Sequence, residues 1–163
     1  MHIPLAKPVF NNFPEEFELK FNKIFHVLKK LGCDYFYFLG INTGFRHRFC
    51  THEDWIDFYV AEKLALNDPL KRVAEGSTFI ALPWQQLTHL HGKDKRTMLA
   101  RPSYGLHNGL TIAKTYQQKR YILTLATELK EHDIARYLLL EKVGILEKFI
   151  KDCMMLFDQH VKQ

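Results

Sequence analysis

The segment WIDFYVAEKLALNDP, residues 55–69, combines a helical pattern with two aromatic residues and a closing Asp-Pro pair. Trp55 and Tyr59 are four residues apart, so on a helix they share one face. Asp68 and Pro69 are expected to stop that helix. Two interpretations are open. The aromatic pair faces the core ahead of an ordinary turn, or it forms one wall of a pocket whose polar ring tips orient a mostly apolar ligand.

Helical and strand-like patterns alternate on both sides of this segment. Helices are predicted where apolar residues recur at three- and four-residue steps, and strands where aromatic and β-branched residues form short runs between turns. The predicted helices cover residues 14–31, 51–66, 70–75, 95–100 and 133–161, and the predicted strands cover 33–41, 45–50, 77–82, 109–116 and 119–127. Thr51 is expected to cap the second helix, and Gly144 to kink or split the last one. This order predicts an α+β fold, an antiparallel sheet with helices on both faces.

The composition narrows the class of protein. A length of 163 residues suits one domain, so residues 1–163 are expected to form a single folded unit. The net charge of +5 is scattered without a run of like charges, which argues against direct nucleic-acid binding. No apolar stretch approaches the ~18 residues of a membrane span, and no secretory signal is evident. Three cysteines without metal-like spacing favour a cytoplasmic location and no structural metal.

The residues that carry chemistry suit binding better than catalysis. The sequence lacks GxSxG, HExxH and glycine-rich phosphate-loop motifs, so neither enzymatic activity nor a cofactor is expected. Trp55, Tyr59, Asp68 and Trp84 remain. An indole N–H only donates a hydrogen bond, whereas an ionised carboxylate only accepts. A ligand with a carbonyl and an amide N–H would satisfy both, and a wrong ligand would leave a buried polar group unpaired at a cost of about 1–3 kcal/mol.

Two further motifs extend this pattern along the chain. GLHNGLTI stands at residues 105–112 and LTL at residues 123–125. Together with the two Trp, the Tyr and the Asp-Pro pair, they have an order and spacing that resemble the autoinducer-binding domain of LuxR-type quorum-sensing regulators. The resemblance covers nearly the whole chain. Each motif is weak by itself, and the combination is specific.

The resemblance implies both a fold and a ligand. The fold would be an α/β/α sandwich with an antiparallel sheet of about five strands. The ligand would be an N-acyl homoserine lactone, held between the sheet and one helical layer. By that likeness, the Trp55 N–H would bond the lactone carbonyl, and Asp68 would accept from the amide N–H. Trp84 would pack near the lactone, and Tyr59 would line the head-group or acyl region.

The same likeness implies further ligand contacts. Thr124 falls where the family often places a hydroxyl that supports the amide end, and Phe38, Ile80 and Leu110 are candidates for the acyl cavity. Thr51 stands where many members carry a Tyr whose hydroxyl binds the acyl carbonyl, and a Thr hydroxyl reaches less far. Two hypotheses therefore stay open. The chain is a sensor for an acyl-homoserine-lactone-like signal, or a family member that binds another ligand or none and acts through protein contacts.

The resemblance also implies partners. Family members usually dimerise, so a homodimer or a heterodimer with a full-length regulator is expected. Full regulators continue into a helix-turn-helix DNA-binding domain, and nothing after His132 resembles one. The chain is therefore expected to make no DNA contact by itself. It is either the sensor part of a longer regulator or a stand-alone sensor domain.

Overall fold

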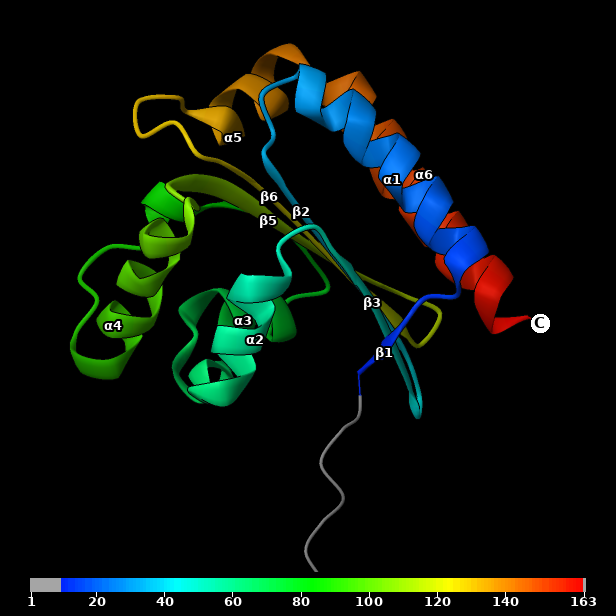
Figure 1. Cartoon of the computed structure of the whole chain (residues 1–163), viewed down its shortest axis with the longest axis horizontal. Coiled ribbons are helices and arrows are strands. Elements are labelled where there is room, and N and C mark those ends of the chain that lie inside the picture. Colours follow the sequence, from blue (N-terminus) through cyan, green and yellow to red (C-terminus); the bar gives the residue numbers. More distant parts are fainter. Residues whose placement is uncertain (1–9, 163) are drawn as a thin grey trace, which may run out of the picture.

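A six-stranded sheet covered by helices on both faces organises residues 10–162, the part of the chain that this computed structural model describes (Figure 1). Five strands pair antiparallel: β2 (Tyr35–Asn42), β3 (Phe45–Cys50), β4 (Phe79–Pro83), β5 (Asn108–Tyr116) and β6 (Lys119–Thr127). The strand order is β1-β3-β2-β6-β5-β4. The short β1 (Asn11–Asn12) pairs in parallel with β3, which therefore is not the edge strand that its polar residues suggested. The predicted α+β sandwich is confirmed, with one more strand than expected.

The helices form two layers (Figure 1). One face of the sheet carries α1 (Glu15–Lys30), α5 (Ile134–Arg136), the π-helical turn η4 (Tyr137–Glu141) and α6 (Val143–Val161). The other face carries α2 (Glu53–Ala61), η1 (Leu64–Asn67), α3 (Pro69–Glu75), η2 (Trp84–Gln86), α4 (Gly92–Ala100) and η3 (Arg101–Tyr104). Within the described residues, no helix has both the length and the apolar composition needed to cross a bilayer.

Three predicted helices differ from the observed ones in their limits. The fourth was expected to begin at Lys95, but α4 begins at Gly92. The second was expected to run to Leu66, but α2 ends at Ala61 because Lys63 adopts a left-handed conformation with φ of 53°. The last predicted helix is split, as expected. The break lies at Lys142, where φ is −128°, and Gly144 lies inside α6. The sequence drew attention to the glycine, whereas the π-helical turn before Lys142 interrupts the helix.

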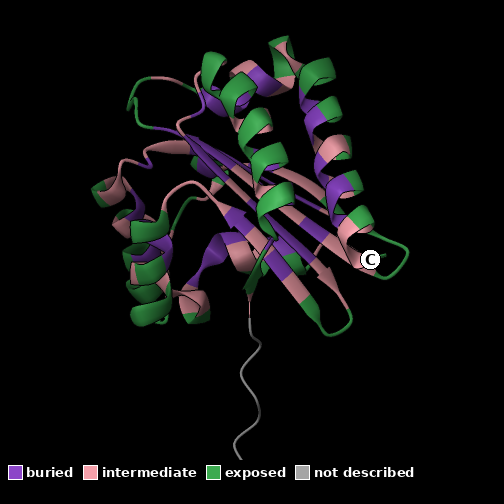
Figure 2. Cartoon of the chain, turned by 45° about the vertical axis from the view of Figure 1, so that its right-hand side comes forward, coloured by how far each residue is buried: buried purple, intermediate pink, exposed green. Residues whose placement is uncertain are grey.

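The strands of the sheet are buried or half-buried along most of their length (Figure 2). Their side chains form two separate cores, one on each face. Successive side chains of a strand point to opposite faces. On β2, Phe36 and Phe38 therefore join the α6-side core, while Tyr35 joins the α2-side core. The α6-side core is rich in phenylalanine. The α2-side core is smaller, and its buried members are Tyr35, Trp55, Ile56, Leu70, Leu82, Trp84, Leu106 and Ala126. The candidate site belongs to this second core.

A pair of histidine side chains, His47 and His160, lies at the rim of the α6-side core. His47 on β3 is 8% exposed, and its ring centroid lies 4.3 Å from that of His160 on α6. The Nδ1 atoms of both rings are buried without a hydrogen-bond partner among the described residues. Burial, and then the neighbouring His160, lower the pKa of His47 below its ordinary value of 6.5.

We expect the free energy of unfolding to fall as the pH drops below about 6.5. The unfolded chain then binds a proton at His47 more readily than the folded chain does, so protonation favours unfolding until the pH passes the lowered pKa of the folded state. His47→Phe should flatten this slope in urea titrations between pH 7.5 and 5. Part of the slope should remain, because burial also lowers the pKa of His52. A His47→Phe profile as steep as that of the unaltered chain would contradict this assignment.

Candidate functional site

Trp55 and Tyr59 lie on one face of α2, as their four-residue spacing predicted. The Trp55 and Tyr59 rings lie 5.6 Å apart between centroids, and Trp55 is only 3% exposed. Phe58 and Tyr104 extend the wall, since the Tyr104 ring lies 5.5 Å from Trp55 and 5.2 Å from Phe58. Tyr104 comes from η3, far along the chain from α2, and the sequence analysis did not identify it.

Asp68 is fixed by its place at the start of α3. A residue before proline favours extended backbone, and Asp68 has φ of −100° and ψ of 108°. Its Oδ1 accepts a 3.1 Å hydrogen bond from the backbone N–H of Leu70, which makes Asp68 the N-cap. Its Oδ2 accepts a 2.8 Å hydrogen bond from the Tyr59 hydroxyl. The Asp-Pro pair, expected to stop one helix, thus begins the next one.

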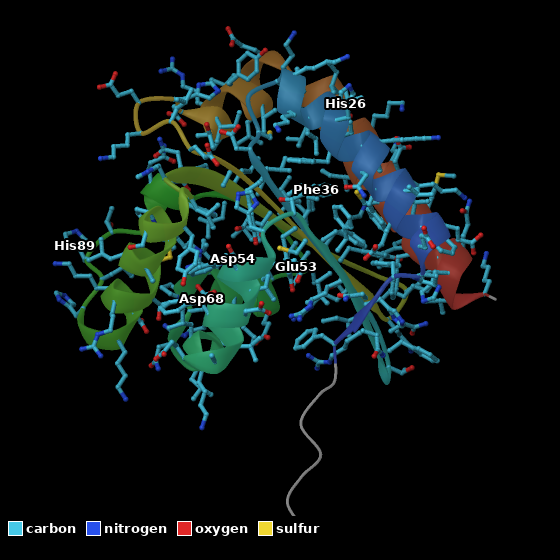
Figure 3. All side chains as sticks on the ribbon, in the orientation of Figure 1. His26, Phe36, Glu53, Asp54, Asp68 and His89 are labelled. Carbon is cyan, nitrogen blue, oxygen red and sulfur yellow. The ribbon has the colours of Figure 1, made fainter. Side chains whose placement is uncertain are left out.

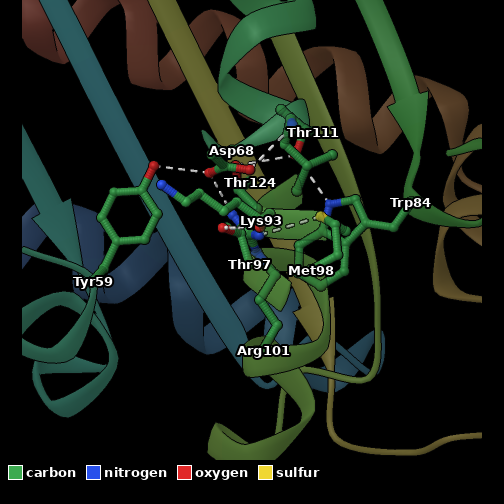
Figure 4. Close-up of polar contacts among 10 residues, drawn as sticks. Tyr59, Asp68, Trp84, Lys93, Thr97, Met98, Arg101, Thr111 and Thr124 are labelled. Atoms are coloured by element: carbon green, nitrogen blue, oxygen red, sulfur yellow. Dashed lines mark hydrogen bonds and ion pairs between the residues drawn. The ribbon is translucent and has the colours of Figure 1, made fainter. Parts of the chain in front are cut away.

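Arg101 is a second residue of this site that was not predicted from the sequence. Its Nη2 lies 2.8 Å from Asp68 Oδ2, and the two side chains are 8% and 4% exposed, so the ion pair is buried (Figure 4). The turn that follows α4 holds Arg101 in place. Its carbonyl accepts a 3.1 Å hydrogen bond from the Leu106 N–H, and Gly105 has the φ of 80° that the turn needs. The sequence held one hint of this pair: Asp68 was expected in an apolar site, and no basic residue had been assigned to balance its charge.

The guanidinium also lies against both tryptophans. Its Cζ is 5.3 Å from the Trp55 ring and 5.5 Å from the Trp84 ring, within the range of cation–π attraction. Its Nη1 donates to the Met98 sulfur at 3.3 Å. Arg101 therefore joins the two indoles to Asp68 and balances the charge of the buried carboxylate.

Trp84 is held on the other side of the site by β5. Its indole N–H donates a 3.0 Å hydrogen bond to Thr111 Oγ1, which lies 3.4 Å from Thr124 Oγ1. A Cβ added at Gly109 would lie 2.5 Å from the indole ring, so only glycine lets Trp84 pack there. Gly109 and Thr111 of the GLHNGLTI motif therefore position Trp84, the first by leaving room for the indole and the second by accepting its hydrogen bond. Thr124 reaches the site through Thr111.

Thr51 does not cap α2, contrary to prediction. The N-cap is His52, which makes no side-chain cap hydrogen bond. Thr51 Oγ1 instead accepts a 3.0 Å hydrogen bond from the Phe36 N–H and lies 3.0 Å from His52 Nδ1. Its hydroxyl therefore joins the end of β3 to β2. A shallow depression of about 450 Å³ borders it, lined by Thr51, His52, Glu53, Asp54, Trp55 and Tyr104.

The three predicted acyl-cavity residues do not come together. Ile80 packs against the α2-side core, which contains Trp55 and Trp84. Phe38 and Leu110 belong to the α6-side core, on the opposite face of the sheet. Phe38 and Leu110 therefore lie across the sheet from Trp55 and Trp84. Alternation along β2 and β5 separates them from Trp55, and the apolar character of both faces hid the difference.

The site offers hydrogen bonds rather than proton transfer. Burial, and then the neighbouring Asp68, raise the pKa of Tyr59 well above its ordinary range, so the phenol stays protonated and donates. Within the described residues, no group of three or more His, Cys, Asp or Glu side chains is placed to hold a metal ion. Figure 3 shows Asp68 among α2, α3 and α4, the helices that cover the face of the sheet opposite α1 and α6.

Comparisons with known proteins agree with this arrangement. The model of the autoinducer binding domain family matches residues 16–154. No curated protein matches the chain.

Solved structures share the fold at low identity. A crystal structure of Escherichia coli SdiA has a TM-score of 0.71 at 15% identity, and the match covers 92% of this chain and 64% of that one. The N-acylhomoserine lactone dependent LuxR family transcription factor CepR2 from Burkholderia cenocepacia has a TM-score of 0.63 at 15% identity, with 88% and 84% covered. SdiA in complex with octanoyl-rac-glycerol has a TM-score of 0.62 at 15% identity, with 89% and 62% covered.

Proposed function

This chain belongs to the autoinducer-binding domain family, and from that premise we propose that it binds an N-acyl homoserine lactone or a related amphiphilic signal. Domains of this family are sensors rather than enzymes, so the chain is a signal-sensing domain. We further propose that residues 1–163 act as one cytoplasmic ligand-binding unit, which regulates transcription through an attached or partner DNA-binding regulator. The three free cysteines, Cys33, Cys50 and Cys153, fit a reducing compartment.

One observation carries the proposal: four residues spread over thirty positions of sequence meet in one buried shell. Trp55, Asp68 and Trp84 are 3%, 4% and 6% exposed, and Tyr59 bonds Asp68 directly. A purely packed core has no need for two indoles, a phenol and a carboxylate at one point. Polar groups converging among aromatic side chains are typical of small-molecule sites.

The proposed contacts follow from donor and acceptor chemistry. Trp55 N–H would donate to a head-group carbonyl, and Trp84 would pack against the head group. Ile80 would lie along the acyl chain. The names of two structural neighbours support an acylated ligand, because one is described as N-acylhomoserine lactone dependent and another is complexed with octanoyl-rac-glycerol. Thr124 would act on the ligand indirectly, through its hydrogen bond with Thr111.

We expect added acyl homoserine lactones to raise the melting temperature and to change tryptophan emission. A ligand that binds only the folded state stabilises it by about 2.7 kcal/mol at a concentration of 100 times Kd. The chain has two tryptophans, and both belong to the site, so emission reports on it directly. Trp55→Phe should weaken binding roughly tenfold, through the loss of one buried donor. The measurement is a titration by thermal shift.

A matched pair of variants separates a lost contact from general destabilisation. Tyr59→Phe removes a 2.8 Å hydrogen bond to Asp68 inside the site. Tyr121→Phe removes a 2.8 Å hydrogen bond to Asp158 in the α6-side layer. Ligand affinity should fall for the first variant and hold for the second. If no lactone from hexanoyl to dodecanoyl shifts the melting temperature or the emission, the lactone proposal fails.

The alternative is a family member that acts through protein contacts without a lactone. The position of Arg101 favours this alternative. Its guanidinium lies against both indoles and already forms an ion pair with Asp68. In that case the site is a closed packing unit. Mass spectrometry of the protein purified from its own host would then find no bound small molecule, and ligand panels would leave its stability unchanged.

We also propose that the chain dimerises, with itself or with a full-length regulator. Exposed apolar side chains on η4 and α6 support this proposal, namely Leu140, Val143, Ile145 and Met155. Light scattering after size exclusion, with and without ligand, measures the first case. Co-purification with a full-length regulator measures the second.

A further inference from the structure

We propose that the outer surface of α4 and the neighbouring turn η1 dock the protein peripherally on a bilayer that contains anionic lipids. The docking surface consists of Lys93, Lys95, Arg96 and Leu99 of α4 together with Leu66 of η1. These side chains are exposed and lie outside the α2-side core, so the docking needs no ligand. Three features support it: the two faces of α4, the charges that remain uncompensated, and the exposed leucines.

α4 separates buried side chains from exposed ones along two faces. Thr97 is buried, Arg101 directly after the helix is buried, and Met98 packs against the α2-side core. The opposite face holds four exposed residues at steps of three and four positions: Gly92, Lys95, Arg96 and Leu99. A shallow depression of about 460 Å³ follows this face. Figure 1 shows α4 at the edge of the molecule, on the side away from α1 and α6, so the exposed face is open to a partner.

The cations of α4 lack compensating charges. The one acidic residue of the helix, Asp94, already forms a pair of hydrogen bonds with Arg72 of α3, at 2.9 and 3.0 Å. Lys93, Lys95 and Arg96 are exposed and form no salt bridge with any residue that the structure describes. The helices α1 and α6, by contrast, mix acidic and basic residues along their length. α4 therefore presents three positive charges that attract an anionic surface.

Two exposed leucines distinguish a bilayer from other anionic partners. Leu99 is 61% exposed, and Leu66 is 75% exposed on η1, which packs against α4. Basic residues beside exposed leucines are typical of segments that lie in a bilayer interface, where the leucines enter the acyl boundary and the cations attract anionic head groups. Proteins that bind single-stranded nucleic acid instead offer aromatic side chains for the bases to stack on, and α4 and η1 contain none. The leucines therefore favour a lipid surface.

The charge of α2 sets the orientation of the docked protein. Glu53, Asp54 and Asp57 are exposed on α2, and this helix contains no Lys or Arg. Anionic head groups repel these carboxylates and attract the cations of α4. The protein should therefore turn α4 toward the bilayer and α2 away from it.

Vesicle flotation of the full chain without ligand tests the docking. One set of vesicles contains phosphatidylcholine alone, and the other contains equal parts of phosphatidylcholine and phosphatidylglycerol. The chain should float with the mixed vesicles only, and about 0.5 M salt should release it, because salt screens exposed charges. Equal binding to both sets, or no binding to the mixed vesicles, overturns the proposal.

A triple variant locates the docking surface. The combination of Lys93→Gln, Lys95→Gln and Arg96→Gln should weaken binding to the mixed vesicles about a hundredfold, since each cation near an anionic surface contributes about fivefold. All three side chains are exposed, so the melting temperature and the tryptophan emission should stay those of the original chain.

The matched control removes the same charge from the opposite layer. It combines Lys23→Gln, Lys30→Gln and Lys151→Gln, three exposed cations of α1 and α6. This variant should keep most of the binding. Equal losses in the two triple variants would mean that net charge alone attracts the chain, and would overturn the role given to α4.

A leucine variant separates a bilayer from a nucleic acid. Leu99→Ser should weaken vesicle binding roughly fivefold, because the side chain loses its contact with the acyl boundary. Leu140→Ser is the control, since Leu140 is 70% exposed on η4, and it should bind vesicles like the original chain. A single-stranded oligonucleotide that binds more tightly than the mixed vesicles, and does so independently of Leu99, would overturn the bilayer as the partner.

Discussion

Replacing Asp68 with alanine is expected to lower the free energy of unfolding by about 3–5 kcal/mol, the range measured when one partner of a buried ion pair is removed. Arg101 would keep its charge at 8% side-chain exposure without a counter-ion. Tyr59 would lose its acceptor, and α3 would lose its N-cap. Urea unfolding followed by circular dichroism measures the change.

Two controls isolate the buried charge as the cause. Asp94→Ala breaks an Arg–Asp pair of the same chemistry on the surface, and exposed pairs contribute little to stability. Its effect should be much smaller. The double variant Asp68→Ala with Arg101→Met should recover a large part of the loss, since it leaves no unpaired charge. An Asp68→Ala chain as stable as the original would refute the buried pair.

Gly109→Ala is expected to destabilise the fold by about 1–3 kcal/mol, as overpacking of a dense core usually does. The new Cβ would lie 2.5 Å from the Trp84 ring, closer than side chains approach. The ring must therefore move, and with it the hydrogen bond to Thr111 and the contact with Arg101. We expect a shift in tryptophan emission together with a lower urea midpoint.

Gly44→Ala is the matched control. Gly44 lies in an exposed turn, and a Cβ there would meet nothing within 4 Å. Its effect should stay within about 0.5 kcal/mol. If Gly109→Ala leaves both the emission and the midpoint unchanged, then the packing of Trp84 against β5 is looser than this structure indicates.

Local physics made much of this protein predictable from sequence. Helical spacing placed Trp55 and Tyr59 on one face of α2, and alternating apolar runs located the strands that pair antiparallel. The combination of motifs indicated the family whose model matches the chain. These features depend on residues near one another in sequence, where backbone geometry and spacing fix the outcome.

Only the tertiary structure decided which groups meet. Arg101 pairs with Asp68 across 33 positions, and no local pattern in the sequence links the two residues. Phe38 lies on the face of the sheet opposite Trp55. The sequence could not reveal this, because the strand is apolar on both faces. The sequence by itself determined most of the elements, the family, and the shared helix face of Trp55 and Tyr59. Long-range pairing of charge and the two-sided burial of the sheet, which local sequence patterns do not encode, determined which side chains meet and how they are bonded.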